Sequence, residues 1–472
     1  MKSNPKDSIQ FGEGNFLRAF VEYCIQILNE KTTFSGQVNL IQPLPDGMIE
    51  VLNRQKGKYH LFLEGIMGGE TIREIQPIDC IDQMVNPYQD FDTFLKLSEN
   101  ENLTFVFSNT TEAGITLDTH DLFTNTPPKS FPGKLTSLLY HRYKTFKGDP
   151  SKVLHIIPCE LIDKNGSKLK NIVLELCDLW QLEEGFKSWI EKNHFYNTLV
   201  DRIVPGFPKK DLDFYEKNLT FDDQLMVTCE PFFLWVIEGN PMLLELFPVD
   251  QLENISVKIV PDLGIYRTRK VRILNGCHTA LVPVGLLNGT LTVSESLEDD
   301  FLKMFLSQTL FEEIIPSIDF DKKELEAYAG SVLERFSNPF IVHQLESIAL
   351  NSISKFKVRV LPSLLSYYQK EGKIPKNLTF AMAALIYFYG KEVSQHPHPL
   401  NDDPQNLSFF QKVWKDNEVE QVAEKTLSNS SLWDQNLNET LPLKGPLSAA
   451  LSAISTHDKI SDAFQAFLIH QS

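Results

Sequence analysis

The chain has 472 residues, of which 42% are hydrophobic and 23% charged, and its formal net charge at pH 7 is −17. This length exceeds what one compact core accommodates, so we expect two domains, and the composition excludes long disordered regions. The negative charge argues against nucleic acid or an anionic membrane surface as a partner. The polar N-terminus lacks a signal-peptide core, and the most apolar window, 380–390, is too short to span a bilayer. We therefore expect a cytoplasmic protein.

The first half alternates strand-like and helix-like segments. Residues 8–28 combine a short apolar run, a glycine pair and an amphipathic helix, which is typical of the start of a βα unit. Further strands are predicted at 38–43, 103–110 and 152–161, and helices at 91–100, 133–146 and 168–180. This alternation predicts an α/β domain with a mostly parallel, doubly wound sheet.

The second half contains only helical patterns. They cover residues 269–287, 297–315, 322–336 and 339–369. We expect an all-α C-terminal domain and place the boundary near residues 261–266, which gives domains of 1–260 and 261–472.

Cysteine and histidine spacing does not favour a metal site. The six cysteines form no CxxC pair and have no zinc-ligand spacing with histidine, so we expect reduced thiols. His396 and His398 could ligate a metal, but they lie between prolines in a loop without further ligands. We therefore expect no metal.

A glycine turn follows the first predicted strand. GEGNFL (12–17) begins like a dinucleotide-binding fingerprint but lacks its third glycine. Gly12 permits a tight turn, and Gly14 lets the backbone approach a pyrophosphate at the helix N-terminus. Leu17 stands where the third small residue belongs, which leaves close helix packing to Ala19. The position after a first strand strengthens the interpretation as a nucleotide site.

The end of the second strand does not indicate which nicotinamide cofactor is preferred. An acid there would bind the ribose hydroxyls of NAD. This chain has Gln42 followed by Pro43, and Asp46 is a more distant candidate.

The apolar segment RKVRILNGCHTA (269–280) carries Lys270, Asn275 and His278. On an α-helix Asn275 would lie about 140° and His278 about 80° from Lys270, so all three share one sector. A lysine against apolar neighbours loses its charge easily and can therefore take a proton from an alcohol. The side-chain amide of Asn275 could donate a hydrogen bond to the developing oxyanion, and His278 could orient the lysine. This set suits hydride transfer without a metal. The alternative is a snorkelling lysine, an Asn-Gly cap and a core histidine.

The pattern Lys-x4-Asn-x2-His resembles the signature of the mannitol dehydrogenase family of polyol-specific long-chain dehydrogenases. Blocks at 10–20, 105–115, 200–204, 229–237 and 335–340 resemble family blocks in the same order, so the resemblance covers nearly the whole chain. It implies a Rossmann-like N-terminal domain, a helical C-terminal domain, NAD as cofactor and no catalytic metal.

The resemblance also implies roles for individual residues. Lys270 would be the general acid/base, assisted by Asn275 and His278. The cofactor would lie on Gly12, Gly14, Asn15, Phe16, Ser108, Asn109 and Thr110. The last three end a strand, where a doubly wound sheet places its ligand; the alternative for them is capping of the strand end.

Several positions depart from the polyol-oxidising members and resemble the branch of the family that acts on hexuronates. Leu161 replaces an asparagine that shares the oxyanion role, Ser347 replaces an arginine, and His343 replaces an acid. Lys355 is retained. A uronate carries a carboxylate, which pairs best with arginine. We therefore expect substrate contacts at Lys355, Arg359 and His343, and assign Lys357 to a solvated face.

These features predict NADH-dependent reduction of a keto-hexuronate to an aldonate, a small-molecule reaction. Another hexuronate such as fructuronate, or a mannitol/fructose-type substrate, is the alternative on the same scaffold. A non-catalytic dinucleotide-binding protein and a metal-dependent isomerase are alternatives of other classes.

Overall fold

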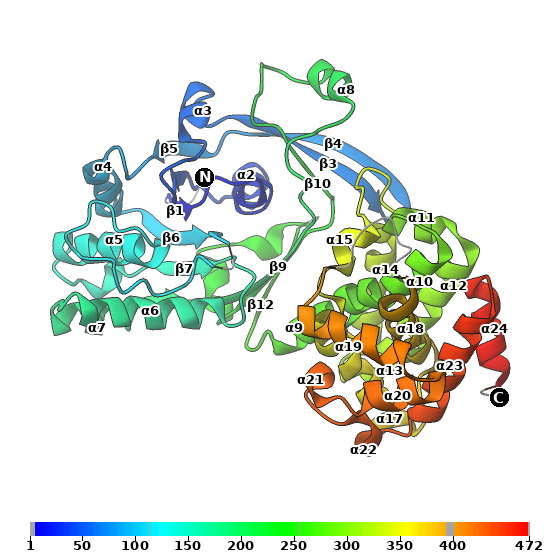
Figure 1. Ribbon diagram of the computed structural model, residues 1–472. Helices are drawn as coiled ribbons and strands as arrows, with labels where there is room; N and C mark the ends of the chain where they lie inside the picture. The colour runs from blue at the N-terminus through cyan, green and yellow to red at the C-terminus, as the bar shows by residue number, and fades with distance from the viewer. Residues whose placement is uncertain (1–4, 112, 254, 393–400, 471–472) are drawn as a thin grey trace. The chain divides into compact units, whose positions relative to one another are not determined.

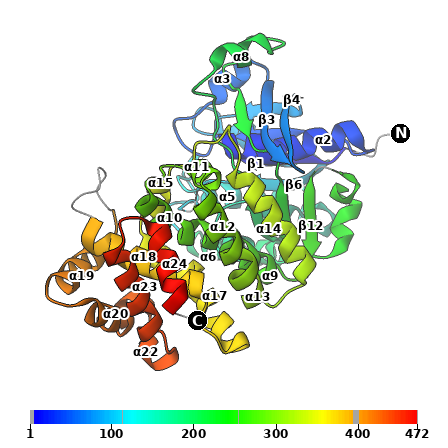
Figure 2. The ribbon, with the colours of Figure 1, turned by 90° about the vertical axis from the view of Figure 1, so that its right-hand side faces the viewer.

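The computed structural model describes residues 5–111, 113–253, 255–392 and 401–470. The chain divides into two compact units (Figures 1 and 2). The N-terminal unit comprises Met1–Gly65 and Thr71–Gly264, and the helical unit comprises Ile66–Glu70 and Ile265–Ser472. The predicted succession of an α/β part and an all-α part is confirmed.

The N-terminal unit is built on a six-stranded parallel sheet with the order β5-β2-β1-β6-β7-β8. Its strands are β1 (Asp7–Phe11), β2 (Val38–Ile41), β5 (Ile81–Val85), β6 (Leu103–Ser108), β7 (His155–Pro158) and β8 (His194–Phe195). The four strands expected from the sequence are all present. The chain leaves β1 toward β2 on one side and returns to β6 on the other. The ends of β1 and β6 therefore form the switch point at which such sheets bind ligands.

Helices cover both faces of this sheet, as the alternation of side chains requires. In β6, Phe105 and Phe107 enter one core and Val106 enters the other, because successive strand residues point to opposite faces. The first core includes the helix that runs through α1 (Asn15–Leu17), the π-helix η1 (Arg18–Glu22) and α2 (Tyr23–Lys31). The second is covered by α4 (Phe91–Lys96), α5 (Phe131–Thr145), α6 (Asn165–Leu179) and α7 (Glu184–Ile190), which gather together in Figure 1.

Two smaller sheets were not predicted. One has the order β10-β3-β4, with β3 (Tyr59–Met67), β4 (Glu70–Ile78) and β10 (Val227–Cys229); the other has the order β12-β11-β9, with β9 (Asn197–Asp201), β11 (Leu234–Glu238) and β12 (Ser256–Val260). Most of β4 is exposed or half-buried, so it lacks a clear apolar pattern. Short helices α3 (Ile49–Arg54) and α8 (Leu212–Lys217) complete this unit.

The tip between β3 and β4 belongs to the helical unit. The backbone N–H groups of Gly68 and Gly69 donate to the carboxylate of Glu334 at 3.2 and 2.9 Å. Both glycines have positive φ, so the tight turn depends on them.

The helical unit surrounds two buried helices, α10 (Gly276–Asn288) and α18 (Lys376–Tyr387). Around them lie α9 (Gly264–Arg269), η6 (Lys270–Asn275), α11 (Val293–Glu298), α12 (Asp300–Gln308), η7 (Thr309–Ile314), α13 (Ile315–Ser317), α14 (Lys322–Phe336), α15 (Leu345–Ala349), α16 (Ser352–Arg359), α17 (Leu361–Glu371), η8 (Phe388–Glu392), α19 (Pro404–Lys415), α20 (Val419–Leu427), α21 (Ser430–Trp433), α22 (Leu437–Thr440), α23 (Lys444–Thr456) and α24 (Ile460–His470). The apolar window at 380–390 lies in α18 and η8. None of the helices in the described ranges is long and apolar enough to cross a membrane.

The cysteines are unpaired and buried, as the sequence suggested. Within the described part of the chain, no group of three His, Cys, Asp or Glu residues could hold a metal ion. His396 and His398 lie outside the described residues.

Candidate functional site

The glycine turn lies at the switch point of the parallel sheet. Gly12 has φ +115°, and its N–H donates to Ile41 O at the end of β2 at 3.0 Å. A Cβ at this position would lie 3.1 Å from Asn109 O, beyond the end of β6. Gly14 is exposed, and a Cβ there would meet no protein atom within 4 Å. A tight first glycine and an open second one fit a dinucleotide cofactor, whose pyrophosphate needs close approach to the backbone.

A buried polar network holds this turn. Gln10 Nε2 donates to Gly12 O at 2.9 Å and to Glu22 Oε1 at 2.7 Å. Tyr59 OH donates to the other oxygen of Glu22 at 2.8 Å. Burial raises the pKa of Glu22, and the hydrogen bonds from Tyr59 and Gln10 and the charge of Arg18 oppose that shift. Sequence reasoning missed this network; the charges in the apolar helix after the turn were the available signal.

Asn15 and Phe16 differ in their surroundings. Asn15 is exposed, and its Oδ1 accepts from Arg18 Nη2 at 2.7 Å. Phe16 is half-buried and stacks on Phe20, with ring centroids 4.9 Å apart. Phe16 therefore packs on the core beneath the turn, while Asn15 lies at its surface.

The predicted residues at the end of β6 bind the end of β7. Ser108 Oγ donates to Glu160 Oε2, and Thr110 N and Oγ1 both donate to Glu160 Oε1, all at 3.0 Å. Asn109 Nδ2 donates to Cys159 O at 2.8 Å. Burial raises the pKa of Glu160, and these hydrogen bonds lower it. The contacts favour capping of the strand end as one role of the three residues, with Glu160 as the acceptor that the sequence analysis overlooked.

In the helical unit, the lysine motif lies on a π-helix rather than on a regular α-helix. The segment η6 spans Lys270–Asn275, and α10 follows from Gly276. The α-helical angles expected for Asn275 and His278 are therefore wrong for this turn. A π-helix bonds residue i to residue i+5, so Lys270 and Asn275 lie one turn apart on the same side. His278 follows three residues later, one α-helical turn further along that face.

His278 links this face to the predicted substrate residues. Its ring is 8% exposed and stacks on Phe336, with centroids 4.0 Å apart and an interplanar angle of 12°. It also meets His343 edge-to-face, with centroids 5.0 Å apart. Burial, and next the charge of Lys355, lower the pKa of His343. Burial and the charge of Arg359 in turn lower the pKa of Lys355.

Lys355 and Arg359 are four residues apart on α16, so they are neighbours on one face of that helix, on the same unit as His343 and the lysine motif. Lys355 Nζ donates to Ile348 O at 2.8 Å. A Cβ on Gly276 would lie 3.1 Å from Arg359 O, so a glycine is needed where the start of α10 packs on the end of α16.

Three other predicted positions are peripheral within their own units. Lys357 Nζ binds Oδ1 of the exposed Asp434 at 3.0 Å, and the side chain of Lys357 itself is half-buried. Ser347 is exposed, and Leu161 is 62% exposed.

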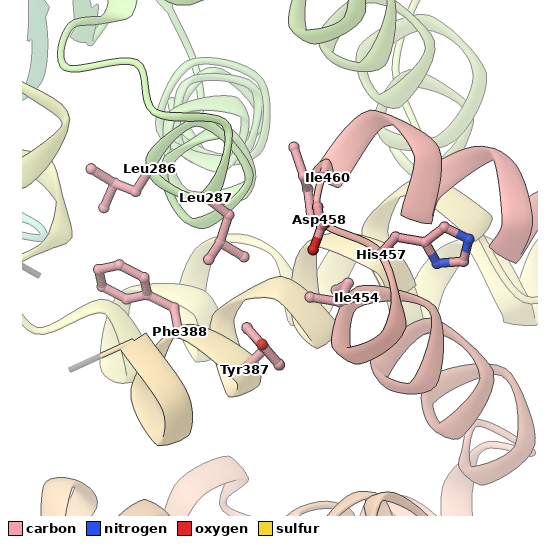
Figure 3. A pocket seen from close by; sticks show the side chains of 8 residues that line it. All are labelled: Leu286, Leu287, Tyr387, Phe388, Ile454, His457, Asp458 and Ile460. Atoms are coloured by element: carbon pink, nitrogen blue, oxygen red, sulfur yellow. The ribbon is translucent and has the colours of Figure 1, made fainter. Parts of the chain in front are cut away.

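A separate hollow of about 170 Å³ lies between α10, α18, η8, α23 and α24 (Figure 3). It is lined by Leu286, Leu287, Tyr387, Phe388, Ile454, His457, Asp458 and Ile460. Figure 3 shows the ring of His457 directed away from the aliphatic side chains. None of the predicted site residues lines this hollow.

A Rossmann-type sheet with a glycine turn at its switch point, followed by a helical domain, defines a nicotinamide dinucleotide-dependent oxidoreductase that acts on a CH–OH group. The family models support this class directly. The mannitol dehydrogenase Rossmann domain matches residues 6–249, and the mannitol dehydrogenase C-terminal domain matches residues 262–455. The chain therefore belongs to the mannitol dehydrogenase family.

Individual relatives are similar over nearly the full length. The altronate oxidoreductase of Phocaeicola vulgatus is 44% identical over 95% of this chain and 94% of its own length. That of Bacillus subtilis is 45% identical over 95% and 93%. The structure of Pseudomonas fluorescens mannitol 2-dehydrogenase with NAD and D-mannitol is similar in fold, with a TM-score of 0.69 at 20% identity over 98% of this chain and 94% of that one. A substrate-free D-sorbitol dehydrogenase gives a TM-score of 0.79 at 20% identity over 98% of each chain.

Proposed function

We propose that the protein catalyses the reversible, NADH-dependent reduction of D-tagaturonate to D-altronate in hexuronate (galacturonate) catabolism. The names of the relatives supply altronate, and the resemblance to the hexuronate branch of the family supplies D-tagaturonate as the keto acid paired with it. The observation that supports the chemistry is the π-helical turn Lys270–Asn275, followed in α10 by His278, on the unit that also carries Lys355 and Arg359. A proton donor, an amide and nearby cations are what reduction of an anionic keto sugar requires.

NADH, held at the turn of Gly12 and Gly14, would supply the hydride for the keto carbon. Lys270 Nζ donates a proton to the keto oxygen as the carbon–oxygen double bond becomes single, so that a secondary alcohol forms. The side-chain amide of Asn275 donates a hydrogen bond to the same oxygen while negative charge grows on it. His278 orients the lysine. In the oxidative direction Lys270 takes the hydroxyl proton back.

The substrate carboxylate would be bound by Arg359 and Lys355, with His343 beside them. Burial, and next the repulsion from Arg359, disfavour the charge on Lys355 and lower its pKa. A carboxylate placed between the two cations would relieve that repulsion. This gives the acid group a stabilising role that a hydroxymethyl group would not have.

The test is NADH oxidation by the purified protein with tagaturonate, fructuronate and fructose, with and without a chelator. We expect fast, chelator-insensitive turnover that is confined to tagaturonate. Lys270→Ala should lower kcat by about 10²–10⁴-fold, because the positioned acid is lost. Lys357→Ala is the matched control, since Lys357 instead binds Asp434. A Lys270→Ala variant with the turnover of the wild type would refute the mechanism.

The other outcomes separate the alternatives. Equal turnover on fructose would reject the uronate assignment and keep the scaffold chemistry. Preference for fructuronate would change the substrate only. Binding of NADH without turnover on any of the three sugars would favour a non-catalytic dinucleotide-binding protein.

A further inference from the structure

The end of β2 lacks the acid that commonly binds the adenosine ribose, and the side chain in its place is already engaged. Gln42 is 3% exposed. Its Nε2 donates to Leu44 O and Pro45 O, both at 2.9 Å, and its Oε1 accepts from Ile49 N at 3.4 Å. Gln42 therefore shapes the loop after β2, and its donors and acceptor point into that loop.

A different acid, Glu13 of the glycine turn, lies beside the loop that follows β2. Glu13 lies between Gly12 and Gly14 and is 7% exposed. Its Oε1 accepts from Met48 N at 3.2 Å. A Cβ on Gly47 would lie 2.2 Å from Glu13 Oε1 and 2.5 Å from Gln42 Cδ. The carboxylate of Glu13 and the amide of Gln42 thus lie on either side of one glycine at the end of β2.

The charges around this point are acidic. Residues 42–48 read QPLPDGM and contain one charged side chain, that of the exposed Asp46. Arg18 is 1% exposed, and its guanidinium donates to Glu13 O at 3.1 Å, to Asn15 Oδ1 at 2.7 Å and to Leu225 O, so its donors are already bound by protein atoms. Burial raises the pKa of Glu13, whereas Met48 N–H and Arg18 oppose that shift.

We propose that Glu13 is the acid that selects NAD(H) over NADP(H), in place of the acid normally found at the end of the second strand. An acid near the adenosine ribose accepts hydrogen bonds from its hydroxyls and repels a 2′-phosphate. The selectivity is thereby carried by the pyrophosphate-binding turn itself. This proposal rests on the nicotinamide-dependent function and is independent of the sugar substrate.

The test measures NADH and NADPH affinities of the full chain by fluorescence titration, without turnover. In Glu13→Gln the ratio of NADPH to NADH affinity should rise about tenfold or more, because a like-charge repulsion is removed. Asp46→Asn is the matched control, an exposed acid of the same loop, and should change the ratio by less than about threefold. An unchanged ratio in Glu13→Gln, or an equal change in Asp46→Asn, would overturn the proposal.

A second measurement uses the wild-type protein, so it does not depend on folding of the variant. AMP should displace NADH more effectively than 2′,5′-ADP, which adds only the 2′-phosphate. Equal displacement would overturn the proposal. Because both measurements are of binding, a protein that selects NADH but does not reduce tagaturonate would refute only the proposed substrate.

Discussion

Replacing Arg359 by glutamine should weaken binding of a uronate and leave binding of an uncharged ketose nearly unchanged. Arg359 ends α16 and is half-buried. It lies four residues after Lys355 on this helix, so the two cations are neighbours, and burial together with the charge of Arg359 lowers the pKa of Lys355. No described residue forms a hydrogen bond or ion pair with its guanidinium. A substrate carboxylate is the partner this planar donor suits.

The size of the effect follows from the charged hydrogen bond that would be lost. Such bonds contribute about 1.5–3 kcal/mol, which corresponds to about 10–150-fold in affinity. Part of the loss would be offset, because removing Arg359 also removes the repulsion that lowers the pKa of Lys355. Lys355 would then hold its proton more firmly and bind the carboxylate better. We therefore expect an increase in KM nearer tenfold.

The assay compares KM for tagaturonate and for fructose in the wild type, Arg359→Gln and Lys357→Gln. Lys357 lies on the same helix but is paired with Asp434, so its variant controls for the loss of a positive charge from α16. Equal losses on both sugars would show that Arg359 does not bind the carboxylate. An equal effect of Lys357→Gln would show that only the general field matters.

Four further substitutions test the turn, the strand ends and a buried acid. Gly12→Ala should lower the free energy of unfolding by about 1–3 kcal/mol, because the φ of Gly12 is +115°. Gly14→Ala should weaken NADH binding only. Equal losses of unfolding free energy in the two variants, measured by urea unfolding, would contradict this. Glu160→Ala should cost about 1–3 kcal/mol and lower the urea midpoint, since the buried Ser108 hydroxyl and the half-buried Thr110 N–H lose their acceptor; an unchanged midpoint would count against that role. Burial raises the pKa of Glu313 from 4.5 to about 7. Between these two pH values the folded state therefore binds more protons than the unfolded state. The free energy of unfolding falls as pH rises through this range, by up to about 3 kcal/mol. Glu313→Gln should flatten that part of the urea-stability profile, and an unaltered profile would refute the assignment.

Local patterns were sufficient for the main architecture. The first strand, its glycine turn and the following helix lie within 25 consecutive residues, Asp7–Lys31, and the apolar run, the glycines and the helical pattern that predict them are all local. The buried helix α18 was predictable because an apolar run of that length must be covered by protein. The β10-β3-β4 sheet was not, since the partner of β3 lies far away in the chain and most of β4 is exposed or half-buried.

The sequence by itself determined which chemical groups are present and roughly on which element each one lies: Lys270, Asn275 and His278 on one helix, and the glycines at one turn. Only the tertiary structure decided how these side chains are oriented. The extra residue in the π-helical turn brings Asn275 nearer to the face of Lys270 than the angle of about 140° that a regular α-helix gives this spacing. Likewise, Glu13 and Glu160 gained partners only when strands distant in sequence came together, because a buried carboxylate needs donors that no local pattern reveals.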